Sequence, residues 1–180
     1  FKFKKQNILV GDNVVFNDEE LIIDFVNNRK NELVRPRVAN IDQLLILMST
    51  KEPEISQYLI YKYLSYANYY HIPSIVILTK VDMLSDRKEI ETIKNELENI
   101  NVKCIFHSKK THEGLDEIKE ILKDKTSVLM GQTGVGKSSL INELDERKKN
   151  NIKEIIDEGR IIDLWNREIV NKKVEEEEKN

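Results

Sequence analysis

The clearest chemical signal in this sequence is the run GQTGVGKS, which extends from Gly131 to Ser138. It matches the pattern GxxxxGK[ST], in which backbone N–H groups approach nucleotide phosphates so closely that glycine is required. We expect Lys137 to reach the β and γ phosphates and the Ser138 hydroxyl to ligate Mg²⁺. The alternative is a glycine-rich turn with an exposed lysine. The position of the run after a predicted strand and before a predicted helix favours a phosphate loop.

A second motif, TKVD, covers Thr79 to Asp82 at the end of another predicted strand. An aspartate in this place accepts two hydrogen bonds from guanine, whose N–H and NH₂ donors adenine does not offer as a pair. The stem of Lys80 can lie along the face of the base. The alternative is that Asp82 only caps a helix. The accompanying phosphate motif favours guanine recognition over that role. Asp82 in turn disfavours an ATP-dependent P-loop kinase.

A third segment, SKKTHEG, covers Ser108 to Gly114 and also follows a predicted strand. In a nucleotide-binding sheet, a loop in this position offers backbone N–H groups to the carbonyl of the base. The alternative is an ordinary polar loop before a helix. His107 lies immediately before the loop, and the sequence leaves a role near the base and a plain surface role both open.

The elements that position these motifs alternate between short apolar runs and stretches of helical periodicity. The expected strands are 43–48, 74–78, 102–106 and 126–130, and the expected helices are 53–70, 88–100, 115–122 and 138–144. This pattern indicates an α/β fold with a parallel sheet that is covered by helices on both faces. Ligand loops of such sheets lie at the carboxyl ends of the strands, so the three motifs converge although the phosphate loop comes last. That order indicates a circularly permuted P-loop GTPase-like fold.

The first part of the chain follows a different pattern. Two short apolar runs flank the turn signal Gly11-Asp12-Asn13, and residues 21–25 predict another strand. We interpret residues 1–34 as the last strands of an oligonucleotide-binding barrel and residues 35–180 as the nucleotide-binding domain. Phe1 in place of methionine suggests a fragment.

Composition limits the other function classes. The net charge of −3 provides no global positive field for nucleic acid, so RNA contact needs local basic residues. The candidates are Lys2, Lys4, Lys5, Arg29, Lys30, Arg35 and Arg37. A single cysteine, Cys104, rules out an intramolecular disulfide and a zinc site built on cysteine pairs, and it favours the cytoplasm. We see no apolar run long enough to span a membrane.

The segments RPRVANIDQ (35–43), TKVD, SKKTHEGL and GQTGVGKSSLIN, in this order, resemble the circularly permuted GTPases of the RsgA (YjeQ) family. The resemblance extends from about residue 11 to residue 144 and implies an oligonucleotide-binding barrel, a permuted GTPase domain and a zinc-binding module. It also implies ribosome-stimulated GTP hydrolysis during late maturation of the small (30S) ribosomal subunit. The implied partners are that subunit and its rRNA, and we expect a monomer.

Matched residue by residue, the resemblance assigns the guanine base to one set of positions and the phosphates to another. Guanine specificity falls to Thr79, Lys80, Val81 and Asp82, and less closely to Ser108, Lys109 and Lys110, because Lys109 stands where the family usually has a small residue. Binding of the GTP or GDP phosphates and of the Mg²⁺ ion is assigned to Gly131, Gln132, Thr133, Gly134, Val135, Gly136, Lys137, Ser138 and Ser139. Lys137 and Ser138 are the expected catalytic residues.

The sequence departs from this family in three places. Most of the barrel and the whole zinc module are missing from it. No threonine follows Thr133 to serve as a switch residue, and no DxxG turn follows the phosphate loop. The nearest approximation is GRIIDLWN, whose Asp163 is a candidate remnant of the Mg²⁺-supporting aspartate; the alternative is a chance apolar segment. If the switch strand is lost, we expect residues 152–170 to cover the sheet edge that the phosphate-loop strand would expose.

Three functional hypotheses follow. The first is a GTPase of small-subunit maturation, in which water attacks the γ-phosphate while Lys137, Mg²⁺ and loop N–H groups stabilise the developing charge. The second is a non-catalytic fragment that binds guanine nucleotides but lacks functional switches. The third is a structural module that leaves the site unused.

Overall fold

The computed structural model describes residues 2–3, 7–17, 19–20, 22–34, 37–144, 160–163 and 169–170. The chain forms two compact units, Phe1–Ile41 and Asp42–Asn180. The sequence analysis placed the boundary after residue 34. The first unit extends further because strand β4 (Glu32–Leu33) pairs with strand β5 (Val38–Ala39) in an antiparallel ladder.

The first unit contains a three-stranded sheet. Its strands are β1 (Lys2–Phe3), β2 (Val14–Asn17) and β3 (Ile22–Val26), in the order β1-β3-β2. The predicted strands at 14–16 and 21–25 are confirmed by β2 and β3, which pair with each other antiparallel. The apolar run before Gly11 does not pair with β2. Instead, Val10 bridges Val38 in parallel, so the glycine turn does not close a hairpin.

A buried carboxylate fixes the turn before β2. Asp12 accepts hydrogen bonds from the Leu9 backbone N–H at 2.7 Å and from Arg29 Nε at 2.6 Å, and its side chain is 1% exposed. The bonded Arg29 guanidinium lowers the pKa of Asp12. Arg29 also pairs with Glu32 at 2.7 Å. This arginine, one of the candidate RNA contacts, is therefore engaged within its own unit.

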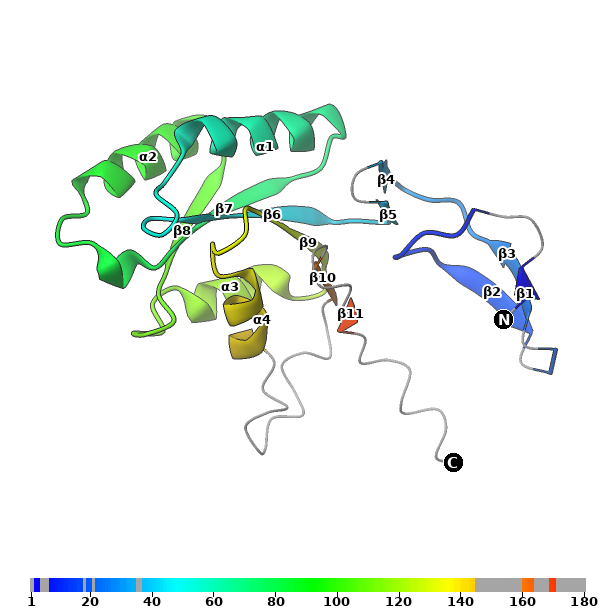
Figure 1. Cartoon of the computed structure of the whole chain (residues 1–180). Coiled ribbons are helices and arrows are strands. Elements are labelled where there is room, and N and C mark those ends of the chain that lie inside the picture. The colour runs from blue at the N-terminus through cyan, green and yellow to red at the C-terminus, as the bar shows by residue number, and fades with distance from the viewer. Residues whose placement is uncertain are drawn as a thin grey trace. The chain divides into compact units, whose positions relative to one another are not determined.

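The second unit is built on a six-stranded sheet (Figure 1). Its strands are β6 (Gln43–Ser49), β7 (Ser74–Thr79), β8 (Lys103–His107), β9 (Thr126–Met130), β10 (Arg160–Asp163) and β11 (Ile169–Val170). Their order is β11-β10-β9-β6-β7-β8, with β10 through β8 parallel and β11 antiparallel to β10. The parallel α/β sheet predicted from the sequence is confirmed.

Helices cover both faces of this sheet, as predicted. Figure 1 shows α1 (Gln57–Tyr69) and α2 (Lys88–Asn99) on one face, and α3 (Leu115–Leu122) and α4 (Lys137–Leu144) on the other. The prediction that the first helix begins at Pro53 is wrong. Residues 51–54 form turns, and the helix begins only after Ser56, whose side chain accepts a hydrogen bond from the Leu59 N–H.

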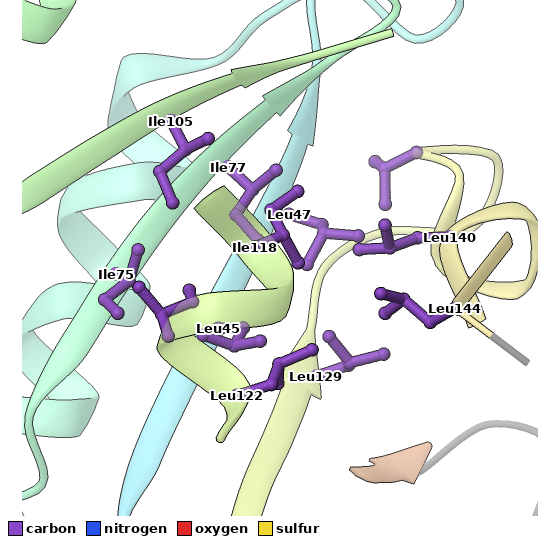
Figure 2. Packing of buried hydrophobic residues seen from close by; sticks show 12 residues of the cluster. Leu45, Leu47, Ile75, Ile77, Ile105, Ile118, Leu122, Leu129, Leu140 and Leu144 are labelled. Atoms are coloured by element: carbon purple, nitrogen blue, oxygen red, sulfur yellow. The ribbon is translucent and has the colours of Figure 1, made fainter. Parts of the chain in front are cut away.

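The core beneath α3 and α4 is a single apolar cluster. Alternate residues of the strands, such as Leu45 and Leu47 of β6, meet Ile118 and Leu122 of α3 and Leu140 of α4 (Figure 2). Leu45, Leu47, Ile118 and Leu140 are fully buried. Burial of a leucine or isoleucine side chain contributes about 1.5–3 kcal/mol. The cluster therefore fixes the two helices that border the loops at the carboxyl ends of the strands.

The edge beyond the phosphate-loop strand is covered, in agreement with the expectation for residues 152–170. Strand β10 pairs with β9 in parallel, with Arg160 opposite Thr126 and Asp163 opposite Leu129. The helix expected around residues 152–156 lies outside the described residues. None of the helices in the described part of the chain has the length and apolar character to span a membrane.

Candidate nucleotide-binding site

The loops at the carboxyl ends of β7, β8 and β9 come together at one edge of the sheet. The loops after β7 and β8, the end of the phosphate loop and the start of α4 border a cavity of about 390 Å³. Its walls are formed by Thr79, Lys80, Asp82, Met83, His107, Lys109, Lys110, Gly136 and Ser139. Three lysines and one aspartate make this a cationic cavity with a single carboxylate in its wall. This excess of positive charge, with one carboxylate, favours a ligand that carries a polyphosphate and also a group that donates hydrogen bonds.

The phosphate loop connects β9 to α4. Lys137 is the first residue of α4, and its Nζ donates to the carbonyl oxygens of Gly131 at 2.9 Å and Gln132 at 2.8 Å. The ammonium group is therefore held across the loop, and the side chain is buried. At Gly131, a Cβ atom would lie 2.4 Å from the Leu47 carbonyl oxygen. Glycine is thus required there by the close approach of β6.

Thr79 joins the guanine motif to the phosphate loop. Its hydroxyl lies 2.5 Å from the Val135 carbonyl oxygen and 3.3 Å from that of Met48. The residue is 3% exposed. A buried hydroxyl must find an acceptor, so this contact fixes the loop relative to β7.

Lys80 turns the chain out of β7. Its backbone adopts a left-handed conformation with φ of 60°, which is uncommon for a residue other than glycine. Its Nζ donates to the Lys51 carbonyl at 3.3 Å and also contacts the Glu52 carbonyl. The turn places Asp82 in the short 3₁₀ helix Val81–Met83, at the cavity wall.

Asp82 is oriented by the third motif. Ser108 Oγ donates to Asp82 Oδ1 at 2.6 Å, and the same hydroxyl accepts from the Thr111 N–H at 3.2 Å. Ser108 is fully buried, whereas Asp82 is exposed to the cavity side of the loop. One carboxylate oxygen is therefore held by serine, and the group retains acceptor capacity for a base with two adjacent donors.

A salt bridge between Arg87 and Glu113 stabilises the loop Ser108–Gly114. Its Glu113 carboxylate forms a two-pronged pair with Arg87 at 2.6 and 2.8 Å, and this bonded arginine lowers the pKa of Glu113. The Glu113 carbonyl accepts from the Ser108 N–H at 3.2 Å and faces His107 Nδ1 at 3.0 Å. Such bidentate pairing gives geometric definition to a loop that would otherwise be free to move.

Seven of the predicted site residues line this cavity: Thr79, Lys80, Asp82, Lys109, Lys110, Gly136 and Ser139. Val81 and Val135 are fully buried, so their side chains belong to the core rather than to the cavity wall. Asp163 ends β10, and the backbone register of its strand with β9 places it next to the start of the phosphate loop. Met83 and His107 also line the cavity, and neither is among the predicted site residues. His107 is 3% exposed, which excludes the surface role.

The fold agrees with solved structures of known proteins. The chain superimposes on YjeQ from Thermotoga maritima with a TM-score of 0.71 and 34% identity over 80% of its length and 55% of that protein. It matches YloQ, a circularly permuted GTPase, with a TM-score of 0.66 and 35% identity. A profile of the RsgA GTPase family matches residues 26–160. The chain belongs to the RsgA GTPase family.

Curated members of the RsgA family agree with this assignment. The small ribosomal subunit biogenesis GTPase RsgA of Caldanaerobacter subterraneus is 44% identical over 146 residues, which cover 78% of this chain and 49% of that protein. The protein of the same name from Mycoplasmopsis agalactiae is 40% identical over 144 residues, which cover 79% of this chain and 49% of that protein. The chain thus spans about half the length of the curated relatives it matches.

Proposed function

We propose that this chain binds GTP and GDP and hydrolyses GTP in the late maturation of the small (30S) ribosomal subunit. The observation that supports it best is the Asp82 carboxylate, held by Ser108 at 2.6 Å in the wall of the cavity that the phosphate-loop helix also borders. Family membership and the names of the matched relatives support the ribosomal role. We place the protein in the cytoplasm as a monomer, with the small subunit and its rRNA as partners.

The proposed chemistry divides the site into two halves. Asp82 accepts the two donors of guanine, and the backbone of Lys109 and Lys110 faces the base carbonyl. Lys137 exchanges its loop carbonyls for phosphate oxygens and stabilises the charge that develops as water attacks the γ-phosphate. Gly131 and Gly136 keep the loop backbone accessible to the phosphates. In the phosphate half of the site, Lys137 is thus the side chain that acts directly in hydrolysis.

Mg²⁺ fits this arrangement at Ser138, the second residue of α4. When bound, the ion neutralises charge on the β and γ phosphates. We propose Asp163 as a second supporting group, because the pairing of β10 with β9 brings the end of β10 to the start of the phosphate loop. Within the described residues, no three His, Cys, Asp or Glu side chains cluster as a metal site, so the ion would rely on Ser138, Asp163, phosphate and water.

Guanine specificity is the first prediction to test. We expect Mg²⁺-GDP to bind the purified chain, and Asp82→Asn to weaken GDP binding by about tenfold or more, because a charge-assisted hydrogen bond is lost. The same variant should gain affinity for xanthosine diphosphate, whose C2 carbonyl accepts from the asparagine amide. Calorimetry with both nucleotides measures this exchange. Equal GDP affinity in the two proteins would contradict the assignment of Asp82.

A non-catalytic nucleotide-binding chain is the competing function, because the sequence has no threonine after Thr133 and no DxxG turn. Single-turnover hydrolysis of GTP with purified small subunits distinguishes the two. A rate above that of the subunits alone, lost in Lys137→Ala, supports the GTPase. Binding without any such rate supports the competing function.

A further inference from the structure

A carboxylate outside the three sequence motifs and two histidines connect the guanine side of the site to the phosphate side. Glu143 sits in the last turn of α4, the helix that begins with Lys137. Its side chain is 7% exposed, and its two carboxylate oxygens face two histidines of the neighbouring segment. Oε1 lies 2.6 Å from Nδ1 of His112, and Oε2 lies 3.3 Å from Nε2 of His107. A carboxylate buried to this degree is costly unless its oxygens are bonded.

The hydrogen-bonding roles of the two rings follow from their other partners. A carboxylate only accepts, so Nδ1 of His112 carries the proton in its contact with Glu143. His107 Nδ1 faces the Glu113 carbonyl at 3.0 Å, and a carbonyl also only accepts, so this nitrogen is protonated too. In a neutral His107 ring, Nε2 is then an acceptor facing Oε2. Within the described chain, Oε2 is the buried side-chain oxygen that lacks a hydrogen-bond partner.

We propose that Glu143 is a positioning residue for guanine recognition, which it serves by bridging α4 to the loop Ser108–Gly114 through its hydrogen bond with His112. This inference rests on the proposed function of the cavity. The loop carries Ser108, which holds Asp82, and α4 begins with Lys137, which serves the phosphates. The bridge therefore holds the guanine half and the phosphate half of the site in a fixed position relative to each other.

The bridge has a consequence for base discrimination. Inosine diphosphate lacks the exocyclic amine of guanine but keeps its ring N–H, so the ratio of its dissociation constant to that of GDP reports how well Asp82 is oriented. Loss of the bridge frees the loop, and Ser108 then holds Asp82 less firmly. Simple loss of fold stability reduces the affinity for both nucleotides alike and leaves the ratio unchanged.

The test uses the full chain with four variants. Glu143→Ala removes both contacts. Glu143→Gln keeps an acceptor for His112 and supplies an amide donor that faces Nε2 of His107, so it should preserve the bridge. His112→Ala removes the bridge at a side chain that is 61% exposed, where loss of folding is not a concern. Glu120→Ala, at an exposed position of α3, is the matched control for removing a helical glutamate.

We expect the ratio of dissociation constants, inosine diphosphate over GDP, to fall about fivefold in Glu143→Ala and in His112→Ala. It should remain at the parent value in Glu143→Gln and Glu120→Ala. An unchanged ratio in His112→Ala, or a fall in Glu143→Gln equal to that in Glu143→Ala, overturns the bridge while parent GDP binding still supports the proposed function. A parent chain that binds neither nucleotide overturns the proposed function itself, and this inference with it.

Discussion

Two lysines of the site, Lys137 and Lys80, are bonded to backbone carbonyls. Lys137 donates to the Gly131 and Gln132 carbonyls, and Lys80 reaches the carbonyls of Lys51 and Glu52. Neutral carbonyl acceptors hold an ammonium less strongly than phosphate oxygens do. Polyphosphate binding can therefore draw Lys137 to new acceptors, while its present contacts keep the side chain within reach. The Gly131 and Gln132 carbonyls therefore hold the Lys137 ammonium group at the phosphate loop.

The thiol of Cys104 offers a pH test of the core of the second unit. The residue lies on β8 and is 2% exposed, and burial raises the pKa of its thiol to about 12. We expect no reaction with iodoacetamide at pH 8 in the folded chain and rapid reaction after denaturation, because the thiolate is the reactive form. Since the unfolded thiol ionises near pH 9, this group should also make the fold less stable as the pH rises from 9 toward 12.

Mass spectrometry of the alkylated chain checks this expectation, with the denatured chain as the positive control. Rapid labelling of Cys104 in the folded protein would contradict the burial of β8.

Helix α1 shows how a single cap defines the limits of an element. Pro53 suggested an earlier start, but residues 51–54 instead form turns beside the phosphate loop, with Pro53 Cδ 3.6 Å from a Cβ placed at Gly134. The helix begins after Ser56, whose hydroxyl accepts from the Leu59 N–H at 3.4 Å. This late start leaves the Lys51 and Glu52 carbonyls free of the helix and available to Lys80. The position of the cap therefore contributes to the guanine side of the site.

Ser56→Ala should lower the free energy of unfolding by about 0.5–1 kcal/mol, because the Leu59 N–H loses the hydroxyl acceptor and keeps only its bond to the Ser56 carbonyl at 3.1 Å. The matched control is Ser65→Ala in the same helix, where the hydroxyl only bonds back to the Tyr61 carbonyl at 2.8 Å. Alanine favours helix, so the control should be neutral or slightly stabilising. Urea unfolding followed by circular dichroism measures both variants. Equal destabilisation by the two substitutions would argue against the cap.

The sheet as a whole explains how a site can keep its geometry with its motifs in an unusual chain order. Strands β7, β8 and β9 are parallel to β6 and its neighbours, so their carboxyl ends share one edge of the sheet. The guanine loops leave β7 and β8, and the phosphate loop leaves β9. Strand β10 then extends the sheet beside β9, and β11 pairs with β10 antiparallel. The late segment of the chain thereby completes the sheet next to the phosphate loop.

Pairing of β10 with β9 predicts slow amide exchange across Thr126–Met130. Ile162→Pro removes a backbone donor from β10, where Ile162 lies opposite Val128. We expect exchange in β9 to become about tenfold faster or more, and the variant to aggregate more readily because an apolar edge is uncovered. Ile162→Val is the control, since it keeps the N–H. Rapid exchange of β9 in the parent chain would show that β10 does not cover this edge in solution.

Local pattern was sufficient to predict much of this molecule. The apolar runs that became β6, β7, β8 and β9 are close to the observed strands, because a fully buried parallel strand needs apolar residues on both faces. The glycines and lysine of 131–138 and the aspartate of TKVD predict the ligand class from residue type and spacing alone. Pro53 does not predict the start of α1, because proline suits both a first helical turn and an ordinary turn, and only the Ser56 contact decides between them.

The sequence by itself determined the fold class, the order of the elements and the three loops that we propose bind phosphate and base, because these depend on periodicity and on motifs that are continuous in the chain. Tertiary structure alone decided which distant side chains meet. Ser108 reaches Asp82, Arg87 reaches Glu113, and Glu143 reaches His112 and His107. It also decided that β10 lies beside β9 and that Val10 bridges Val38. Such contacts leave no periodic trace in the sequence, because they depend on how separate elements pack against one another rather than on their local order.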